Sequence, residues 1–250
     1  MTDVMIKASL CRCSERHQKG ATPSIASEIE HLQVAWVYWA KGRKANIAGA
    51  SMDYIEVLDF WFDDAEAPQT NDTIKAMWLH GDEASDNLIR ERFLPYVSMA
   101  GEGKLSQWLD SPLGALAHII LLDQFSRRVY RGLSAAFRYD EFALALCKRG
   151  LAMGQDQNLL PIQRVFFYTP LQHSEHAEDQ EEALFRFSQL CQSAASFEAG
   201  LFENFYRQAR NHYEIIQRFG RFPQRNASLG RLSTEKEMQW LANGGAKLGP

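Results

Sequence analysis

Long hydrophobic runs are missing from this chain of 250 residues. A helix that crosses a bilayer needs roughly 20 consecutive apolar residues, and no run in the sequence is that long. The first 30 residues also lack the apolar stretch of a secretory signal. We therefore expect no membrane insertion and no export, and a cytoplasmic location.

Cysteine is scarce as well, with four residues in the whole sequence. They are too few and too scattered to form a disulfide framework. Two of them form a lone C-x-C without any accompanying ligand pattern, so we predict neither a metal site nor a redox site there. The four are Cys11, Cys13, Cys147 and Cys191.

Positive charge is in deficit over most of the chain. Residues 1–50 hold seven basic and four acidic residues, which leaves 20 basic and 27 acidic residues for 51–250. Nucleic-acid binding needs a large positive surface. The acidic body of the chain therefore argues against nucleic acid as a partner.

Familiar catalytic and nucleotide-binding motifs are absent too. The sequence contains no G-x-G-x-x-G, no Walker loop, no H-E-x-x-H and no G-x-S-x-G. We predict no cofactor, and these motifs leave open whether the protein is an enzyme.

Helical periodicity dominates what is present. No stretch competes as a strand, and the apolar spacing predicts about eight or nine helices joined by short connectors. The predicted fold class is all-α, with the helices packed as tetratricopeptide-like hairpins. No clean internal repeat supports a regular repeat protein.

The first 51 residues differ from the rest. They lack steady periodicity up to Ile25, and Ile25–Ala40 fits one short amphipathic helix. We predict a poorly ordered or singly helical extension over 1–51 and a single all-helical domain over 52–250. The extension is either a functional arm or upstream sequence before a true start at Met52, and the shift in composition favours the second interpretation.

Several helix boundaries follow from capping residues and from proline. Asp53 is a predicted N-cap, and Thr234 begins a capping box. Gly81 and Pro95 are predicted interruptions of a helical stretch over 72–99. Thr169 and Pro170 are predicted as the N-cap and first residue of a helix that runs to about Ser193.

The helix predicted over 115–130 is apolar on all sides, yet it contains Asp123 and Gln124. A buried carboxylate costs several kcal/mol unless it is paired and hydrogen-bonded. Two partners are open for Asp123. One is Arg127, four residues later on the same helix, and the other is an arginine from a distant basic segment.

That basic segment is FGRFPQRNASLGR, residues 219–231. It has three arginines and no acid, and its glycines and proline exclude one uninterrupted helix. We predict that Arg221 or Arg225 contacts Asp123 or Glu175.

Histidines fall on the inward faces of two predicted helices. His173 and His176 share a face with Gln180, and His212 lies at the centre of the apolar face of the helix predicted over 197–219. Zinc binding would need both of the first two rings and a third ligand, either His212 or Asp123. We predict no tightly bound metal.

Four strings of the sequence together resemble an uncharacterised bacterial family, domain of unknown function family 924. The resemblance covers about 52–242 and implies an all-helical, tetratricopeptide-like fold without an established activity. The strings are DYIEVLDFWF (53–62), LAHIILLDQFSRRVYRG (116–132), FFYTPLQHSEHAEDQE (166–181) and FGRFPQRNASLGRLSTEKE (219–237).

The resemblance extends to individual residues. This chain departs from the family strings at Ser126, Arg128 and Gln224, where the family has proline, asparagine and histidine. The matching residues are Leu122, Asp123, Gln124 and Arg127 in one string, His173, Ser174, Glu175 and Gln180 in the next, and His212, Arg221, Arg225 and Asn226 in and before the last.

These residues lead to one main hypothesis and two rivals. The main hypothesis is a protein that binds a small anionic ligand or an acidic peptide. The first rival is a hydrolase in which His173 or His212 is the general base and Arg221 and Arg225 stabilise an anion. The second is a polar cluster that only stabilises the fold. Ligand identity and oligomeric state do not follow from the sequence. The candidate site residues are Asp123, Gln124, Arg127, His173, Glu175, His212, Arg221 and Arg225.

Overall fold

The computed structural model describes residues 53–63, 71–79, 81–196 and 198–245. Within these ranges every regular segment is a helix and none is a strand, so the predicted all-α class is confirmed. The predicted extension over 1–51 lies outside the described residues, and the proposed boundary at Met52 stays a prediction.

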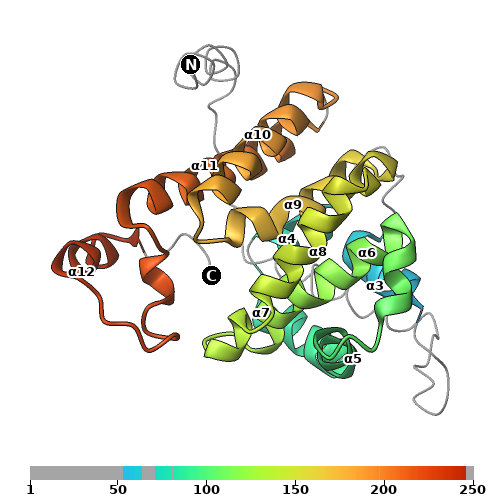
Figure 1. The fold of residues 1–250 in the computed structure, drawn as a ribbon, viewed down its shortest axis with the longest axis horizontal. Helices are drawn as coiled ribbons and strands as arrows, with labels where there is room; N and C mark the ends of the chain where they lie inside the picture. Colours follow the sequence, from blue (N-terminus) through green and yellow to red (C-terminus); the bar gives the residue numbers. More distant parts are fainter. Residues whose placement is uncertain (1–52, 64–70, 80, 197, 246–250) are drawn as a thin grey trace, which may run out of the picture. The chain divides into compact units, whose positions relative to one another are not determined.

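The helices follow one another along the whole described chain, as Figure 1 shows. The α-helices are α3 (Tyr54–Phe62), α4 (Asp72–Leu79), α5 (Glu83–Gly101), α6 (Pro112–Ile119), α7 (Ser126–Val129), α8 (Asp140–Ala152), α9 (Pro161–His173), α10 (Ala177–Ser193), α11 (Ala199–Phe219) and α12 (Glu235–Ala242). A π-helical stretch is η2 (Ile120–Phe125), and the short 3-10 turns are η1 (Ser106–Asp110), η3 (Ser134–Phe137), η4 (Gln155–Asn158) and η5 (Pro223–Arg225).

The number of helices agrees with the prediction. Segments α6, η2 and α7 are continuous, and when they are counted as one helix the described residues hold nine. The tetratricopeptide-like arrangement of these helices stays a prediction. Within the described ranges, no helix combines the length and apolarity needed to cross a bilayer.

Capping residues begin and end several helices as predicted. The Asp53 side chain accepts a hydrogen bond from the Ile55 N–H at the start of α3. Thr234 forms the capping box of α12 with Glu237. Gly220 ends α11 in a left-handed conformation, with φ of 70°, that suits glycine.

Two prolines lie inside helices, contrary to prediction. Pro95 lies inside α5, and Pro170 lies inside α9. The predicted helix start at Thr169 is therefore wrong. Pro170 has no N–H for the carbonyl of Phe166. The Thr169 hydroxyl lies 2.8 Å from that oxygen and 2.9 Å from Asp123 Oδ2, and its single hydrogen can be donated to one of the two. Burial of the last turn of α9 supplies the remaining stabilisation.

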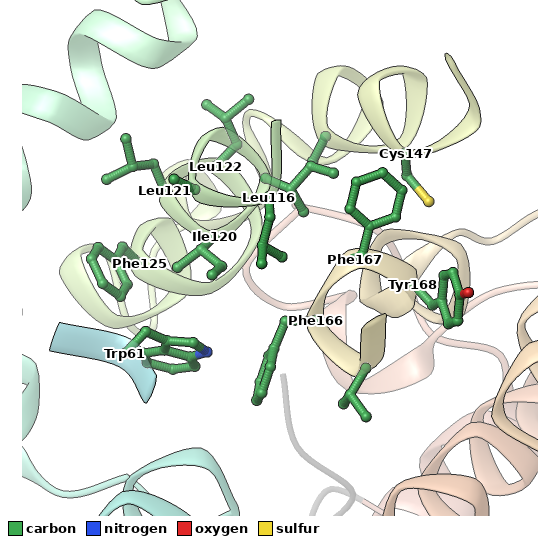
Figure 2. Packing of buried hydrophobic residues seen from close by; sticks show 14 of the residues in the cluster. Trp61, Leu116, Ile120, Leu121, Leu122, Phe125, Cys147, Phe166, Phe167 and Tyr168 are labelled. Carbon is green, nitrogen blue, oxygen red and sulfur yellow. The ribbon is translucent and has the colours of Figure 1, made fainter. Parts of the chain in front are cut away.

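The core centres on the continuous helix α6–η2–α7, which is buried on every side as predicted. Leu116, Ile120 and Leu121 are fully buried. Figure 2 shows Leu116 and Ile120 between the rings of Trp61 and Phe125 on one side and that of Phe167 on the other. The Trp61 ring lies 5.4 Å from that of Phe125, edge to face. This packing leaves Asp123 without access to water.

The long helices α9, α10 and α11 lie side by side, with α10 packed against both of its neighbours. Helix α9 also packs against α6, α8 and η2. The C-terminal end of α9 is thus surrounded by the buried helix and by α11. Segment η5, in the basic segment, follows α11 directly in sequence.

Candidate functional site

Six side chains from six elements form a cluster that we call the polar centre. It contains two carboxylates, two guanidinium groups and two imidazoles. Five of the six residues are buried, and the side chain of the sixth, Asp140, is 19% exposed. The members are Asp123 from η2, Arg127 from α7, Asp140 from α8, His173 from α9, His212 from α11 and Arg225 from η5.

Asp123 is fully buried and accepts from several groups at once. Its nearest contacts are His173 Nδ1 at 2.7 Å, Gln124 Nε2 at 2.6 Å, Thr169 Oγ1 at 2.9 Å and Arg127 Nη2 at 3.5 Å. Burial alone would raise the pKa of this carboxyl, but the neighbouring imidazole, guanidinium and hydroxyl hold the pKa well below its usual range. Asp123 is therefore ionised.

The contact with Asp123 determines the tautomer of His173. An ionised carboxylate only accepts hydrogen bonds, so His173 Nδ1 must carry the hydrogen. Burial lowers the pKa of His173, and the opposing effect of Asp123 does not restore it. The ring is then neutral near pH 7, with its lone pair on Nε2. Within the described residues Nε2 makes no hydrogen bond, and His173 is 8% exposed.

Arg127 and Asp140 form a bidentate ion pair. Arg127 Nη1 lies 2.8 Å from one carboxylate oxygen and Nη2 lies 3.0 Å from the other. Such bidentate pairs are stronger and more specific in geometry than single contacts. Arg127 therefore has Asp140 as its main partner and Asp123 as a second one.

Arg225 enters the polar centre from the basic segment. Its Nη1 donates to the main-chain oxygen of His173 at 3.0 Å and to Asp140 Oδ2 at 3.3 Å. The rings of Phe137 and Phe222 lie 4.9 Å and 4.4 Å from its guanidinium carbon. Arg225 is thus packed between two aromatic rings and joined to the rest of the centre through one nitrogen.

The guanidinium group of Arg225 is buried and incompletely hydrogen-bonded. Burial, followed by repulsion from Arg127, lowers its pKa to about 10, although Asp140 acts in the opposite direction. Its Nε is buried without a partner. The same is true of Arg127 Nε. Buried arginine nitrogens without partners are costly, and they point to a site where another acceptor would fit.

His212 lies beside His173, with 6.0 Å between the ring centroids. Its Nδ1 lies 3.1 Å from the main-chain oxygen of Gln172, which can only accept, so Nδ1 carries the hydrogen. The Phe222 ring is 5.2 Å away. Two of the three histidines predicted to face inward, His173 and His212, are therefore members of one cluster.

The predicted contacts of Arg221 and Arg225 with Asp123 or Glu175 are wrong. Arg221 instead forms a two-pronged pair with Glu237, at 2.7 and 2.8 Å. Asp123 has Arg127 as its arginine partner, which is the local alternative. Glu237 lies only 16 positions after Arg221, so the pair closes a short loop at little entropic cost.

The basic segment nevertheless contacts Glu175, through a different arginine. Arg231 Nη1 and Nη2 lie 2.6 and 2.9 Å from the two carboxylate oxygens of Glu175. The Phe222 N–H also donates to Glu175 Oε1 at 2.8 Å. Glu175 therefore holds the basic segment against the end of α9.

His176 is exposed, although the sequence predicted an inward position. The prediction assumed one helix from 169 to 193, but the helical structure stops at His173 and resumes at Ala177. The break changes the phase of the next helix, and His176 becomes its N-cap. Gln180 is fully buried as expected, and its Nε2 donates to the main-chain oxygens of Gln172 and Ser174 at 2.7 Å each.

Sequence analysis missed Asp140, Phe137 and Thr169. Asp140 occupies the first turn of α8, where an acidic residue is common for helix-dipole reasons alone. Thr169 was interpreted as a cap. Phe137 lies in a short 3-10 turn without periodicity. No local signal distinguishes these residues, because their partners come from distant parts of the chain.

A metal site has no support from side-chain positions in the part of the chain that the structure describes. No group of three or more histidine, cysteine, aspartate or glutamate side chains is arranged there to hold an ion. In particular, exposed His176 does not join His173 in the polar centre.

Comparison with known proteins gives a family and a related structure. Residues 57–245 match the family described as bacterial protein of unknown function (DUF924). A solved structure, that of the protein of unknown function ATU0120 from Agrobacterium tumefaciens, is 31% identical with a TM-score of 0.62. The match covers 76% of this chain and 97% of that one. No curated protein matches this chain.

All six members of the polar centre, from Asp123 to Arg225, lie within the matched range. The family match spans well over half of the chain and includes both the buried helix and the basic segment. The chain belongs to this family of bacterial proteins of unknown function, as its sequence resemblance indicated.

Proposed function

We propose that this protein binds a small anionic ligand, through a carboxylate or phosphate group, at Arg225 in the polar centre. The observation that carries the proposal is the incomplete bonding of Arg225. Only Nη1 has acceptors, while Nε and Nη2 make no hydrogen bond within the described residues. Nε and Nη2 form one edge of the guanidinium, and this two-donor edge matches the two oxygens of a carboxylate or phosphate.

The charges around Arg225 support the same proposal. Burial and Arg127 lower the pKa of Arg225 to about 10, which means that the folded protein disfavours its positive charge. A bound anion would reverse this effect by pairing with the guanidinium. The flanking rings of Phe137 and Phe222 exclude water, which strengthens such a pair.

The small size of the ligand follows from burial. Arg225 is only 5% exposed, so a single functional group fits this environment better than an extended chain. An acidic peptide, the other partner class considered, would have to insert one side chain or its terminal carboxylate. Tighter binding of an acidic peptide than of acetate would favour that class.

The test is anion binding measured by calorimetry, with acetate and methanesulfonate as probes. We expect Arg225→Lys to keep the charge, remove the two-donor edge and weaken binding at least about tenfold, the loss of one charge-assisted hydrogen bond. The matched control is Arg221→Lys in the same segment, because Arg221 pairs with Glu237. Equal affinities in both variants would refute the proposal.

A hydrolytic function is the second candidate, and one specific observation favours it. Asp123 holds His173 Nδ1 at 2.7 Å, which leaves Nε2 as a base. The nearby hydroxyls do not offer a nucleophile, since Ser174 Oγ donates to Asp179 at 2.8 Å. Burial raises the pKa of the Cys147 thiol, which keeps it unreactive. Water would have to be the nucleophile.

This second candidate has its own signature in the pH dependence. Hydrolysis by a histidine base slows as pH falls through the pKa of His173, because protonation removes the lone pair. Assays with a panel of carboxylic and phosphate esters test it. A rate that disappears in His173→Gln but not in His176→Gln would support the hydrolase, and no turnover of any ester would exclude it for those substrate classes.

A further inference from the structure

The four charged groups of the polar centre, two carboxylates and two guanidinium groups, balance one another before any ligand binds. The centre as a whole is neutral when both of its histidines are neutral. The groups that face His173 are Asp123 from η2, Arg127 from α7, Arg225 from η5 and His212 from α11, with Asp140 from α8 behind both arginines.

We propose that the anion binds together with one proton, which His173 takes up from solvent at Nε2. The proposal rests on the anion-binding function proposed above and names the class of ligand further. The ligand is a monovalent anion, such as a carboxylate, and the site accepts it as the equivalent of a weak acid.

Electrostatics in a buried site favours this coupling. A monovalent anion would leave the balanced centre with one uncompensated negative charge, and uncompensated buried charge is costly. A proton on His173 restores the balance. His173 Nδ1 already lies 2.7 Å from Asp123 Oδ1. An imidazolium at His173 would therefore have a buried carboxylate as its counter-ion.

The geometry also leaves one nitrogen of His173 available to become a hydrogen-bond donor. In the neutral ring Nδ1–H donates to Asp123, and Nε2 has no acceptor or donor partner within the described residues. Protonation converts Nε2 into a donor without breaking the bond to Asp123. The main-chain oxygen of His173 accepts a hydrogen bond from Arg225 Nη1 at 3.0 Å, so the two residues are direct neighbours in the polar centre.

Without a ligand, the same surroundings keep His173 neutral. Burial lowers its pKa, and the positive charges of Arg127 and Arg225 add to this effect against the opposing charge of Asp123. An anion next to Arg225 removes part of the repulsion and therefore raises the pKa of His173. By linkage, a ligand that raises this pKa must bind more tightly as pH falls.

The experiment is calorimetric titration of the full chain with acetate and with methanesulfonate, which do not titrate between about pH 6 and 8.5. Each titration is repeated in buffers that differ in ionisation enthalpy, so that the slope of the observed heat gives the protons taken up. We expect close to one proton per bound anion between the pKa of His173 in the free protein and its higher pKa in the complex, and about a tenfold loss of affinity per unit of rising pH in that range.

Two variants assign the proton to a residue. His173→Gln keeps a donor for Asp123 but cannot titrate, so binding should become independent of pH. His176→Gln is the matched control, since this exposed histidine is three positions away, and it should behave as the parent chain. Long-range proton–nitrogen NMR of the histidine rings on the unaltered protein gives the same answer without a variant, through protonation of His173 Nε2 on addition of acetate.

The outcomes separate this inference from the function on which it rests. Anion binding without proton uptake, or proton uptake that persists in His173→Gln, overturns the inference and leaves anion binding intact. Failure of both probes to bind at any pH in that range overturns the proposed function and the coupling with it.

Discussion

Two clusters in this molecule are built from the same residue types and differ in how completely their arginines are bonded. In the first, buried Asp86 of α5 binds both Arg128 and Arg131, and Arg128 Nη2 also donates to the Met77 oxygen at 2.6 Å. In the second, the polar centre, Asp140 binds both Arg127 and Arg225.

The two clusters differ in whether buried arginine nitrogens lack a hydrogen-bond partner. No nitrogen of Arg128 or Arg131 is buried without a partner, whereas the Nε atoms of Arg127 and Arg225 are. The Asp86 cluster also lets one arginine reach water, since the Arg131 side chain is 46% exposed. A cluster whose donors are all satisfied or hydrated needs no further partner. Buried donors without partners are costly, and we propose a bound anion as their missing acceptor.

The largest expected effect concerns Asp123, the carboxylate of the polar centre that His173 and Arg127 share. Asp123→Ala should lower the free energy of unfolding by about 3–5 kcal/mol, because it leaves Arg127 without one partner and removes the acceptor of His173 Nδ1. Urea denaturation measures it. A loss below about 1 kcal/mol would show that the carboxylate contributes no more than an exposed ion pair.

The corresponding change in the other cluster should cost less and leave binding alone. Asp86→Ala removes an acceptor from Arg128, but Arg131 returns to water. We expect a loss of about 2 kcal/mol, typical of hydrogen bonds to charged groups, with an unchanged affinity for acetate. If Asp86→Ala weakened acetate binding as much as Arg225→Lys, the distinction between the two clusters would collapse.

A smaller effect is expected where the basic segment meets α9. Glu175→Gln keeps an acceptor for the Phe222 N–H but weakens the partly exposed pair with Arg231. The free energy of unfolding should fall by about 1 kcal/mol, the upper range for such pairs. Acetate affinity should fall as well, since this contact holds the segment that carries Arg225. Thermal unfolding and calorimetry on one sample measure both.

The smallest expected effect is a change in the pH dependence of stability. Burial lowers the pKa of His118 as well as that of His173. The unfolded chain then binds more protons below its own histidine pKa of about 6.5, so stability is complete above that pH and declines as pH falls below it.

His118 lies outside the polar centre, with its Nε2 3.2 Å from the Ala100 oxygen, and this allows the two contributions to be separated. His118→Gln should reduce the slope of stability against pH and leave the part due to His173. Acetate should remove only that remaining part. A slope that acetate leaves unchanged in His118→Gln would indicate that the anion does not act on His173.

Local features of the fold could be predicted because their interactions are local. The caps at Asp53 and Thr234 and the left-handed stop at Gly220 depend on atoms within a few residues. The buried helix around Leu116 and Ile120 could be predicted because apolar residues cover its whole circumference. The same pattern predicts that the Asp123 carboxylate is buried and therefore needs hydrogen-bonding partners.

Proline 170 shows where local rules fail. Proline usually ends or begins a helix, but tertiary burial favours a continuous α9 through Pro170, and the Thr169 hydroxyl lies 2.8 Å from the carbonyl oxygen that Pro170 leaves without a main-chain donor. The consequence reaches the site, because the helix then breaks after His173 instead. That break leaves His176 exposed, while His173, the last residue of α9, stays buried.

By itself, the sequence determined that this chain is helical, that a carboxylate is buried at Asp123, and that the basic segment needs acidic partners. Which partners meet was decided only in the tertiary structure. Asp123 and His173 are 50 positions apart, and Arg225 and Asp140 are 85 apart. Charges of the same kind are interchangeable in a sequence pattern, and only the packing of α9, α11 and η5 determines which ones approach within hydrogen-bonding distance.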